Sequence, residues 1–511
     1  MVLQFIDQGA AGIGLSERRL IRSHVMKGRN AGRPRQSSKK QTGVVHIRRI
    51  LPMNPPPGVL MPPCTRPLSW NDLTFATFPG ELDGESRRLM HAWFYDISDS
   101  LFPSQFCDKF DIVQSVWVNC MVDEASNHAD FHSTLAISAS YLNFFQRRTK
   151  TSSKDLQHVS KAYALVNRKL SGPDSLSDGA IAAVASLAIY QQIHHQFSTG
   201  RVHLDGLWRM IELRGGIARL MRERRPLAIK PLRLDVELAL QTGAATLFRG
   251  DELPLRPVLC CDPRVTIVEP QYAADGATAA PRPLKQDVTS FARLLGYCSN
   301  SSSKRVENRV RVKPLDFAET LVWLLYRLVA AAPPLTPTTG VETCSQDDLV
   351  HLAMLAFMTS LLPGYGAPFD SHDAASAAGY YPLLADRLES AIQGQAPHSY
   401  VAPATSDWDI APATSDWDSH DSSDDCDGTT AHLLRPFLWA LFMGGITILK
   451  RHDRRQWLSV LIVRTCARLG LHEWPAIYSQ LSEFPWIDTL HSAQGRHLWE
   501  DAKHGHGGVS E

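Results

Sequence analysis

The sequence predicts an all-α fold. Hydrophobic residues make up 44% of the 511 residues and charged residues 21%, which is close to globular averages and is enough apolar material for a core. From about Ser86 onward, segments with helical periodicity clearly outnumber strand-like ones. A chain of this length exceeds what one core usually holds, so we expect one large or two fused helical units.

The first 395 residues divide by composition into three parts. Residues 1–50 form a basic arm that is poor in aromatic residues, and we expect it to be disordered. Residues 51–85 form a proline-rich linker that resists regular structure. Residues 86–395 are predicted to form a large helical domain. Within it, residues 262–314 hold only short apolar pieces and are predicted to be mostly loop.

The remaining residues contain an acidic insert and a second helical stretch. Residues 396–430 hold the octapeptide APATSDWD twice, at 402–409 and 411–418, and we expect a disordered insert there. Trp408 and Trp417 lie among its aspartates, a pattern that fits either an activation segment or a solvated linker. Residues 431–511 are expected to supply helices that complete the domain.

Several helices can be predicted with their faces and ends. Ser177 and Asp178 can cap a helix that starts there, Gly215 or Gly216 can close another, and Pro231 can open one that ends at Gly243. The apolar run Phe437 to Leu449 is too short to span a bilayer and is predicted to be a buried core helix. The predicted stripes are Phe131, Leu135, Leu142 and Phe145; His203, Leu207, Met210, Ile211 and Arg214; and Phe317, Leu321, Leu324, Leu325 and Leu328.

The net charge of +1 gives no hint of a partner, but its distribution does. Between Arg18 and Arg49 almost every charge is basic, which favours nuclear import or phosphate contacts. The sequence AGRPR resembles the core of an AT-hook, although the match is partial and occurs once. The candidate residues for DNA contact or nuclear import are Arg29, Arg33, Arg35, Lys39 and Lys40.

Searches for catalytic and metal-binding patterns return nothing. The sequence has no GxSxG, GxxxxGK[ST] or HExxH motif, so we predict no catalytic residue and no cofactor. His194, His195 and His203 lie close in sequence, yet no further ligand completes a metal site. Asp205 lies two residues after His203, which invites comparison with catalytic His/Asp pairs. We therefore expect these histidines to be packed or solvated, and we expect no metal.

Five pieces, taken in order, resemble the fungal-specific transcription factor domain. They are FCDKFDIVQSVWVNCMVDEASNHADFHSTLAISASYL, SDGAIAAVASLAIY, HLDGLWRMIELRGGI, LLRPFLWALFMGG and FPWIDTLHSAQGRHLW, and they span about Arg88 to Glu500 with gaps. The resemblance implies a helical regulatory region of the kind that usually follows a zinc binuclear cluster. Such a cluster needs six closely spaced cysteines, and none of the nine cysteines lies in residues 1–63, so we expect a member without it.

The resemblance implies a fungal transcriptional regulator, and such proteins often control metabolic or secondary-metabolite gene clusters. We expect it to reside in the nucleus and to act through other transcription regulators or coactivators, with weak non-specific DNA contacts from the arm. We expect no membrane association, and a homodimer and a heterodimer both stay open. The alternative is a helical ligand-binding protein or a biosynthetic enzyme without a recognisable catalytic motif, with a pocket at His203, Leu207, Met210 and Arg214.

Overall fold

The computed structural model describes most of the chain from residue 84 onward. The described ranges are 84–93, 101–108, 128–145, 153–249, 253–255, 257–260, 267–268, 283–300, 311–331, 345–362, 381–396, 428–450 and 452–507. The basic arm, the proline-rich linker and the two APATSDWD repeats lie outside the described residues.

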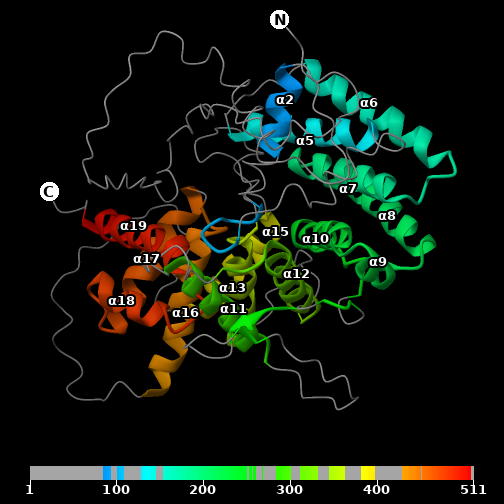
Figure 1. Cartoon of the computed structure of the whole chain (residues 1–511). Helices are drawn as coiled ribbons and strands as arrows, with labels where there is room; N and C mark the ends of the chain where they lie inside the picture. The colour runs from blue at the N-terminus through cyan, green and yellow to red at the C-terminus, as the bar shows by residue number, and fades with distance from the viewer. Residues whose placement is uncertain are drawn as a thin grey trace, which may run out of the picture. The chain divides into compact units, whose positions relative to one another are not determined.

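The all-α prediction is confirmed (Figure 1). The helices are α2 (Gly84–His91), α5 (His128–Phe145), α6 (Ser153–Leu170), α7 (Asp178–Ile193), α8 (Phe197–Leu213), α9 (Ile217–Glu223), α10 (Arg225–Thr242), α11 (Leu284–Asn300), α12 (Pro314–Ala331), α13 (Gln346–Thr359), α15 (Pro382–Gln395), α16 (Gly428–Ile446), α17 (His452–Arg468), α18 (Trp474–Leu481) and α19 (Asp488–Gly507). A two-residue strand, β1 (Leu259–Cys260), pairs antiparallel with β2 (Ile267–Val268). Because these strands are so short, the hydrophobic core is built by packing between helices.

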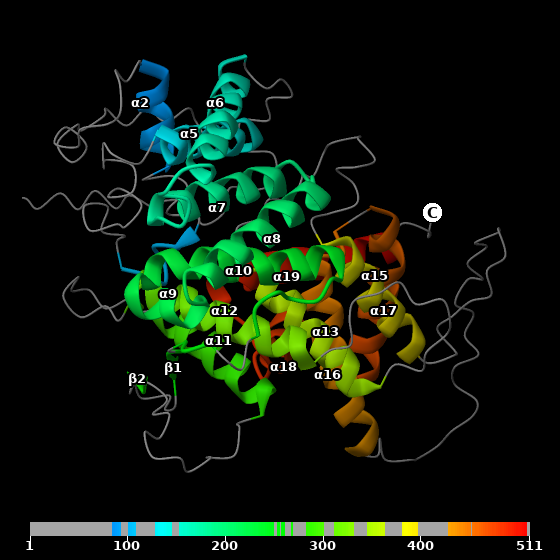
Figure 2. The same ribbon diagram turned by 90° about the vertical axis from the view of Figure 1, so that its right-hand side faces the viewer.

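The early helices pack mainly against helices that are close to them in the chain. Helix α5 packs against α6 and α7, and α7 packs against α8. Helix α10 contacts three helices that precede it in the chain, α7, α8 and α9, and two that follow it, α12 and α15. Farther along the chain, α16 packs against α13, α15, α17 and α19. Figure 2 shows α7, α8 and α10 following one another as neighbours, so α10 joins the early helices to the later ones.

Most predicted helix signals are confirmed where the side chains are described. The Ser177 side chain accepts from the backbone N–H of Ala180 and caps α7, and Gly243 ends α10 in the left-handed conformation at φ 71°. The predicted stripe of α12 is buried throughout. In α5, Phe131 and Leu135 are buried, whereas the side chains of Leu142 and Phe145 lie outside the described part.

The start of α10 differs from the prediction. The helix begins at Arg225, with Pro226 in the first turn, and Pro231 lies inside it rather than opening it. Leu227, Ala228 and Ile229 precede Pro231 and are buried, so core packing extends the helix upstream of the proline. Proline inside a helix removes one backbone hydrogen bond, which packing of this apolar turn offsets.

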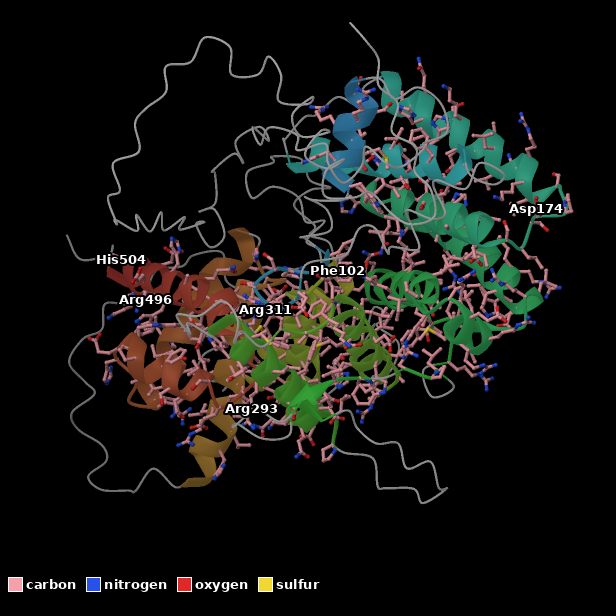
Figure 3. All side chains as sticks on the ribbon, viewed as in Figure 1. Phe102, Asp174, Arg293, Arg311, Arg496 and His504 are labelled. Atoms are coloured by element: carbon pink, nitrogen blue, oxygen red, sulfur yellow. The ribbon has the colours of Figure 1, made fainter. Side chains whose placement is uncertain are left out.

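The predicted loop at 262–314 contains a 17-residue helix, α11. The prediction missed it because polar residues interrupt its apolar stripe in the sequence. Val288, Phe291, Leu295 and Cys298 nevertheless repeat every three or four residues and are fully buried. Arg311, labelled in Figure 3, donates to the backbone oxygens of Cys298 and Gln105 and so ties α11 to the segment 101–108.

The apolar run of α16 forms a buried core helix, as predicted. Its residues from Phe437 to Phe442 are at most 4% exposed, and α16 ends at Ile446, before Leu449. None of the described helices is both long and apolar enough to cross a membrane. A Cβ on Gly445 would lie 2.6 Å from a methyl of Leu498, so glycine there permits close packing of α16 on α19.

Candidate functional site

Helix α8 holds the predicted pocket residues, and a tight turn positions it. His195 sits in this turn in the left-handed conformation at φ 55°, which histidine adopts more often than most residues. The backbone N–H of Gln196 donates to the oxygen of Gln191 at 2.9 Å. The turn therefore sends α8 back along α7, with which it makes a helical hairpin.

One face of α8 is buried against α7 and α10. Leu204, Leu207 and Ile211 are at most 1% exposed, Met210 is 7% exposed, and Gly200 is also buried. Of the predicted stripe, Leu207, Met210 and Ile211 are confirmed as a core face. Its other two members, His203 and Arg214, are only half-buried. These side chains hold α8 in place and are not free to meet a ligand.

The end of α8 is closed by two glycines. Gly215 and Gly216 have φ values of 107° and 86°, a region that side chains disfavour. The backbone N–H of Gly216 donates to the oxygen of Ile211 at 2.9 Å, as in a glycine-terminated helix. The predicted role of this glycine pair is confirmed.

The two polar residues of the predicted pocket are engaged in separate contacts. His203 Nε2 lies 3.3 Å from Tyr163 Oη on α6. Arg214 forms an ion pair with Asp178 at 2.5 Å, and a longer one with Glu223 at 3.8 Å. Because His203 and Arg214 are eleven positions apart along the helix, they lie roughly 16 Å apart along its axis. The structure does not bring the four predicted residues together around one space.

A small cavity lies next to this region and is lined mainly by other residues. Its lining comprises Ala188, Gln192, Phe197, Gly200, Leu204, Leu234 and Leu238, and its volume is about 10 Å³. This volume holds about one water molecule. Sites for metabolites usually have roughly 300 to 1,000 Å³, so this cavity is not one of them.

The histidines around α8 all have a lowered pKa. Burial lowers the pKa of His194, and the nearby His195 lowers it further. Burial also lowers the pKa of His195 and of His203. His194 Nε2 lies 3.0 Å from the hydroxyl of Ser140 on α5. These contacts fit the predicted packing role.

The structure forms no His/Asp pair from His203 and Asp205. The Asp205 carboxylate instead accepts from Arg201 Nε at 2.9 Å. Among the described residues, no group of three or more histidine, cysteine, aspartate or glutamate side chains is arranged to hold a metal ion.

Sequence reasoning missed a layer of buried polar side chains between α7 and α10. The Gln192 side-chain amide donates to Gln241 Oε1 at 3.1 Å and to Glu237 Oε2 at 3.3 Å. Arg233 Nε donates to Glu237 Oε1 at 2.6 Å. The spacing of Arg233, Glu237 and Gln241 along LRLDVELALQ is one turn each, a signal that could have placed them on one face. This layer fixes the packing of the two helices.

A buried carboxylate on α10 also has a structural explanation. Burial raises the pKa of Asp235, and hydrogen bonds from the backbone N–H groups of Leu247 and Phe248 act in the opposite direction. Tyr326 Oη also donates to this carboxylate at 2.8 Å. A perturbed buried carboxylate can mark a catalytic site. Here it anchors the segment after α10 to α12.

The predicted contact residues of the basic arm lie outside the described residues. These are Arg29, Arg33, Arg35, Lys39 and Lys40. Trp408 and Trp417 of the acidic insert also lie outside. Their predicted roles stay predictions.

The part of the chain from α2 to the first turns of α10 matches a known protein family. Residues 88–230 match the fungal-specific transcription factor domain. The match starts within α2 and ends within α10. Comparisons with curated proteins and with solved structures found no match.

The predicted resemblance to the fungal-specific transcription factor domain is confirmed for this segment. The match points to a fungal regulator of transcription. Helix α8, with HLDGLWRMIELRGGI, lies inside the matched domain, as do the four predicted pocket residues. The pieces LLRPFLWALFMGG and FPWIDTLHSAQGRHLW lie beyond it, so their resemblance stays a prediction.

Proposed function

We propose that this protein regulates transcription in the fungal nucleus through protein partners rather than by catalysis. The match of residues 88–230 to the fungal-specific transcription factor domain carries this proposal. The geometry around α8 supports it, because the side chains there are engaged in packing and ion pairs, and the cavity beside them has room for about one water. The partners are other transcription regulators or coactivators.

The finer parts of the proposal rest on the sequence and on the family. The basic arm would supply nuclear import and weak, non-specific phosphate contacts. By analogy with the matched family, the regulated genes would belong to a metabolic or secondary-metabolite cluster.

A tethering experiment tests the proposal. The full chain is fused to a heterologous DNA-binding module in fungal cells, and a reporter behind the cognate site is measured against the module alone. We expect the reporter to change several-fold, up or down, because a regulator acts through the partners that it recruits. A matched fusion carrying Leu207→Asp, which places a charge in the core of α8, should lose the effect.

A reporter equal to that of the module alone, with the fusion folded and nuclear, would contradict the proposal. Turnover of a metabolite by the purified chain would favour the enzyme alternative. Metabolite binding alone would not separate the two readings, since a regulator can also sense a ligand.

A further inference from the structure

The outward side of α8 carries a stripe of four exposed residues. They are Val202, Gly206, Arg209 and Leu213. At 100° per residue they fall within a sector about 60° wide, on the side away from Leu207 and Ile211. Val202 is 68% exposed and Leu213 61%, the two highest values among the exposed large hydrophobic side chains of the described part. Each end of the stripe therefore carries an exposed apolar side chain.

The centre of the stripe is open and charged. A Cβ on Gly206 would meet no atom within 4 Å, so another helix could approach closely there. Asp205 flanks Gly206, and its side chain is 51% exposed. Arg209 lies one turn after Gly206 and is exposed. Within the described part of the chain, no ion pair is found for it. Arg209 thus lies near a half-exposed carboxylate, Asp205, which also accepts from Arg201 Nε at 2.9 Å on the same helix.

The order of these residues makes the stripe complementary to itself. Together with the flanking Asp205, the stripe runs along α8 as apolar, acidic, glycine, basic and apolar: Val202, Asp205, Gly206, Arg209 and Leu213. Two antiparallel copies can be related by a twofold axis midway between Gly206 and Arg209. In that arrangement Val202 of one copy meets Leu213 of the other. Arg209 of each copy then lies over Gly206 and beside Asp205 of the other, where the opposite charges attract.

We propose that this stripe is the surface on which two copies of the chain pair, with their α8 helices antiparallel. A second copy fits better than an unrelated partner because the stripe supplies both apolar ends and the positive charge of the contact, and the flanking Asp205 supplies the negative charge. One helix pair is small compared with the roughly 1,600 Å² of a standard interface, so the dimer is weak and forms at micromolar or higher concentrations. The inference does not rest on the proposed function, and a monomer would leave the regulatory role untouched.

Sedimentation velocity over a concentration series tests the pairing. The full chain should shift from monomer to dimer as its concentration rises. Val202→Asp and Leu213→Asp should each weaken the dimer at least tenfold, because they bury a charge against an apolar side chain. The control is Leu156→Asp on α6, a leucine that is 56% exposed and lies outside the stripe, and it should leave the dimer unchanged.

The charge contact has its own matched pair of variants. Arg209→Glu places a second acid beside Asp205 of the other copy and should weaken the dimer several-fold, more at low salt than at high salt. Arg222→Glu on α9 reverses a similarly exposed arginine outside the stripe and should have no effect. Circular dichroism of each variant confirms that the helices remain folded.

Cross-linking tests the orientation. Chains carrying Val202→Cys are mixed with chains carrying Leu213→Cys and oxidised, with the wild-type chain and its nine native cysteines as background. Antiparallel pairing gives a disulfide between the two different variants. Self-linking of each variant without the mixed product would overturn the proposal. So would a wild-type chain that stays monomeric at 100 µM, or a dimer that none of the stripe variants weakens.

Discussion

His491 Nδ1 accepts a hydrogen bond from the backbone N–H of Ile487 at 3.0 Å. The proton of this imidazole therefore resides on Nε2, which donates to Ser360 Oγ at 3.0 Å. Ser360 Oγ in turn donates to the backbone oxygen of Phe357. This chain of bonds joins the start of α19 to the end of α13 and requires a neutral His491.

We predict that His491 makes stability depend on pH. Burial lowers the pKa of His491 to about 3 in the folded chain, against about 6.5 when unfolded. Between these values only the unfolded chain binds the proton, so stability is complete above about pH 6.5 and falls as the pH drops. The slope from this residue is about 1.4 kcal/mol per pH unit.

His491→Gln should flatten this acid dependence in urea unfolding measured from pH 7 to pH 4. The matched control is His497→Gln on the same helix, which removes a histidine whose side chain is 70% exposed and lies 3.0 Å from Asp501. Its acid dependence should stay steeper than that of His491→Gln. Equal slopes for wild type and His491→Gln would contradict the prediction. Burial also lowers the pKa of His351, which contributes in the same direction and remains in every variant.

Two glycine substitutions should have opposite effects on stability. A Cβ on Gly445 would lie 2.6 Å from Leu498 Cδ2 and 2.8 Å from Leu458 Cδ2. Gly445→Ala should therefore overpack this core and lower the free energy of unfolding by about 1 to 3 kcal/mol. A Cβ on Gly296 in α11 would meet nothing within 4 Å. Gly296→Ala should therefore gain up to about 1 kcal/mol from helix propensity. The urea midpoints of the two variants, compared with that of the wild type, test both predictions. A stabilised Gly445→Ala chain would show that α16 and α19 do not approach closely at this glycine.

Two leucines on α8 should differ sharply when truncated. Leu207 is fully buried, so Leu207→Ala should destabilise the fold by about 2 to 5 kcal/mol. Leu213 is 61% exposed, and Leu213→Ala should change the free energy of unfolding by less than about 0.5 kcal/mol. The measurement uses dilute protein, where pairing of copies does not contribute. Similar losses for both variants would mean that the buried face of α8 is misassigned.

Removing one partner of the ion pair between Arg225 and Glu319 should destabilise the fold more than removing both. Arg225 donates through Nε and Nη2 to both oxygens of Glu319, whose side chain is 1% exposed. Arg225→Met leaves a buried carboxylate without this partner and should cost about 3 to 5 kcal/mol. The double variant Arg225→Met, Glu319→Leu should recover most of that loss in the same unfolding assay. A double variant as unstable as the single one would contradict this account.

The basic arm should determine nuclear accumulation. Replacement of Arg33, Arg35, Lys39 and Lys40 by alanine should shift a fluorescent fusion of the full chain toward the cytoplasm, because the import signal is cationic. The control replaces Arg219 and Arg222, exposed arginines on α9, and should leave the fusion nuclear. Unchanged accumulation of the arm variant would remove the import role from this cluster.

Local patterns were sufficient for several helices and insufficient for two. The cap at Ser177, the stripe of α12 and the left-handed Gly243 depend on residues within a few positions of one another, so the sequence alone predicts them. Helix α11 was missed because its polar residues conceal a buried stripe. The start of α10 was misplaced because Pro231 resembles a first-turn residue, whereas the burial of Leu227 to Ile229 carries the helix through it.

The sequence by itself determined the all-α class, the buried apolar run of α16 and the resemblance that the match at 88–230 confirms. Only the tertiary structure decided which polar groups meet. Gln192 finds Glu237 from 45 residues away, and Arg225 finds Glu319 from 94 residues away. It also decided that His203 and Arg214 serve different neighbours, and that the side of α8 bearing Val202 and Leu213 remains uncovered. Burial and pairing at such separations depend on how helices pack, which periodicity within one helix does not specify.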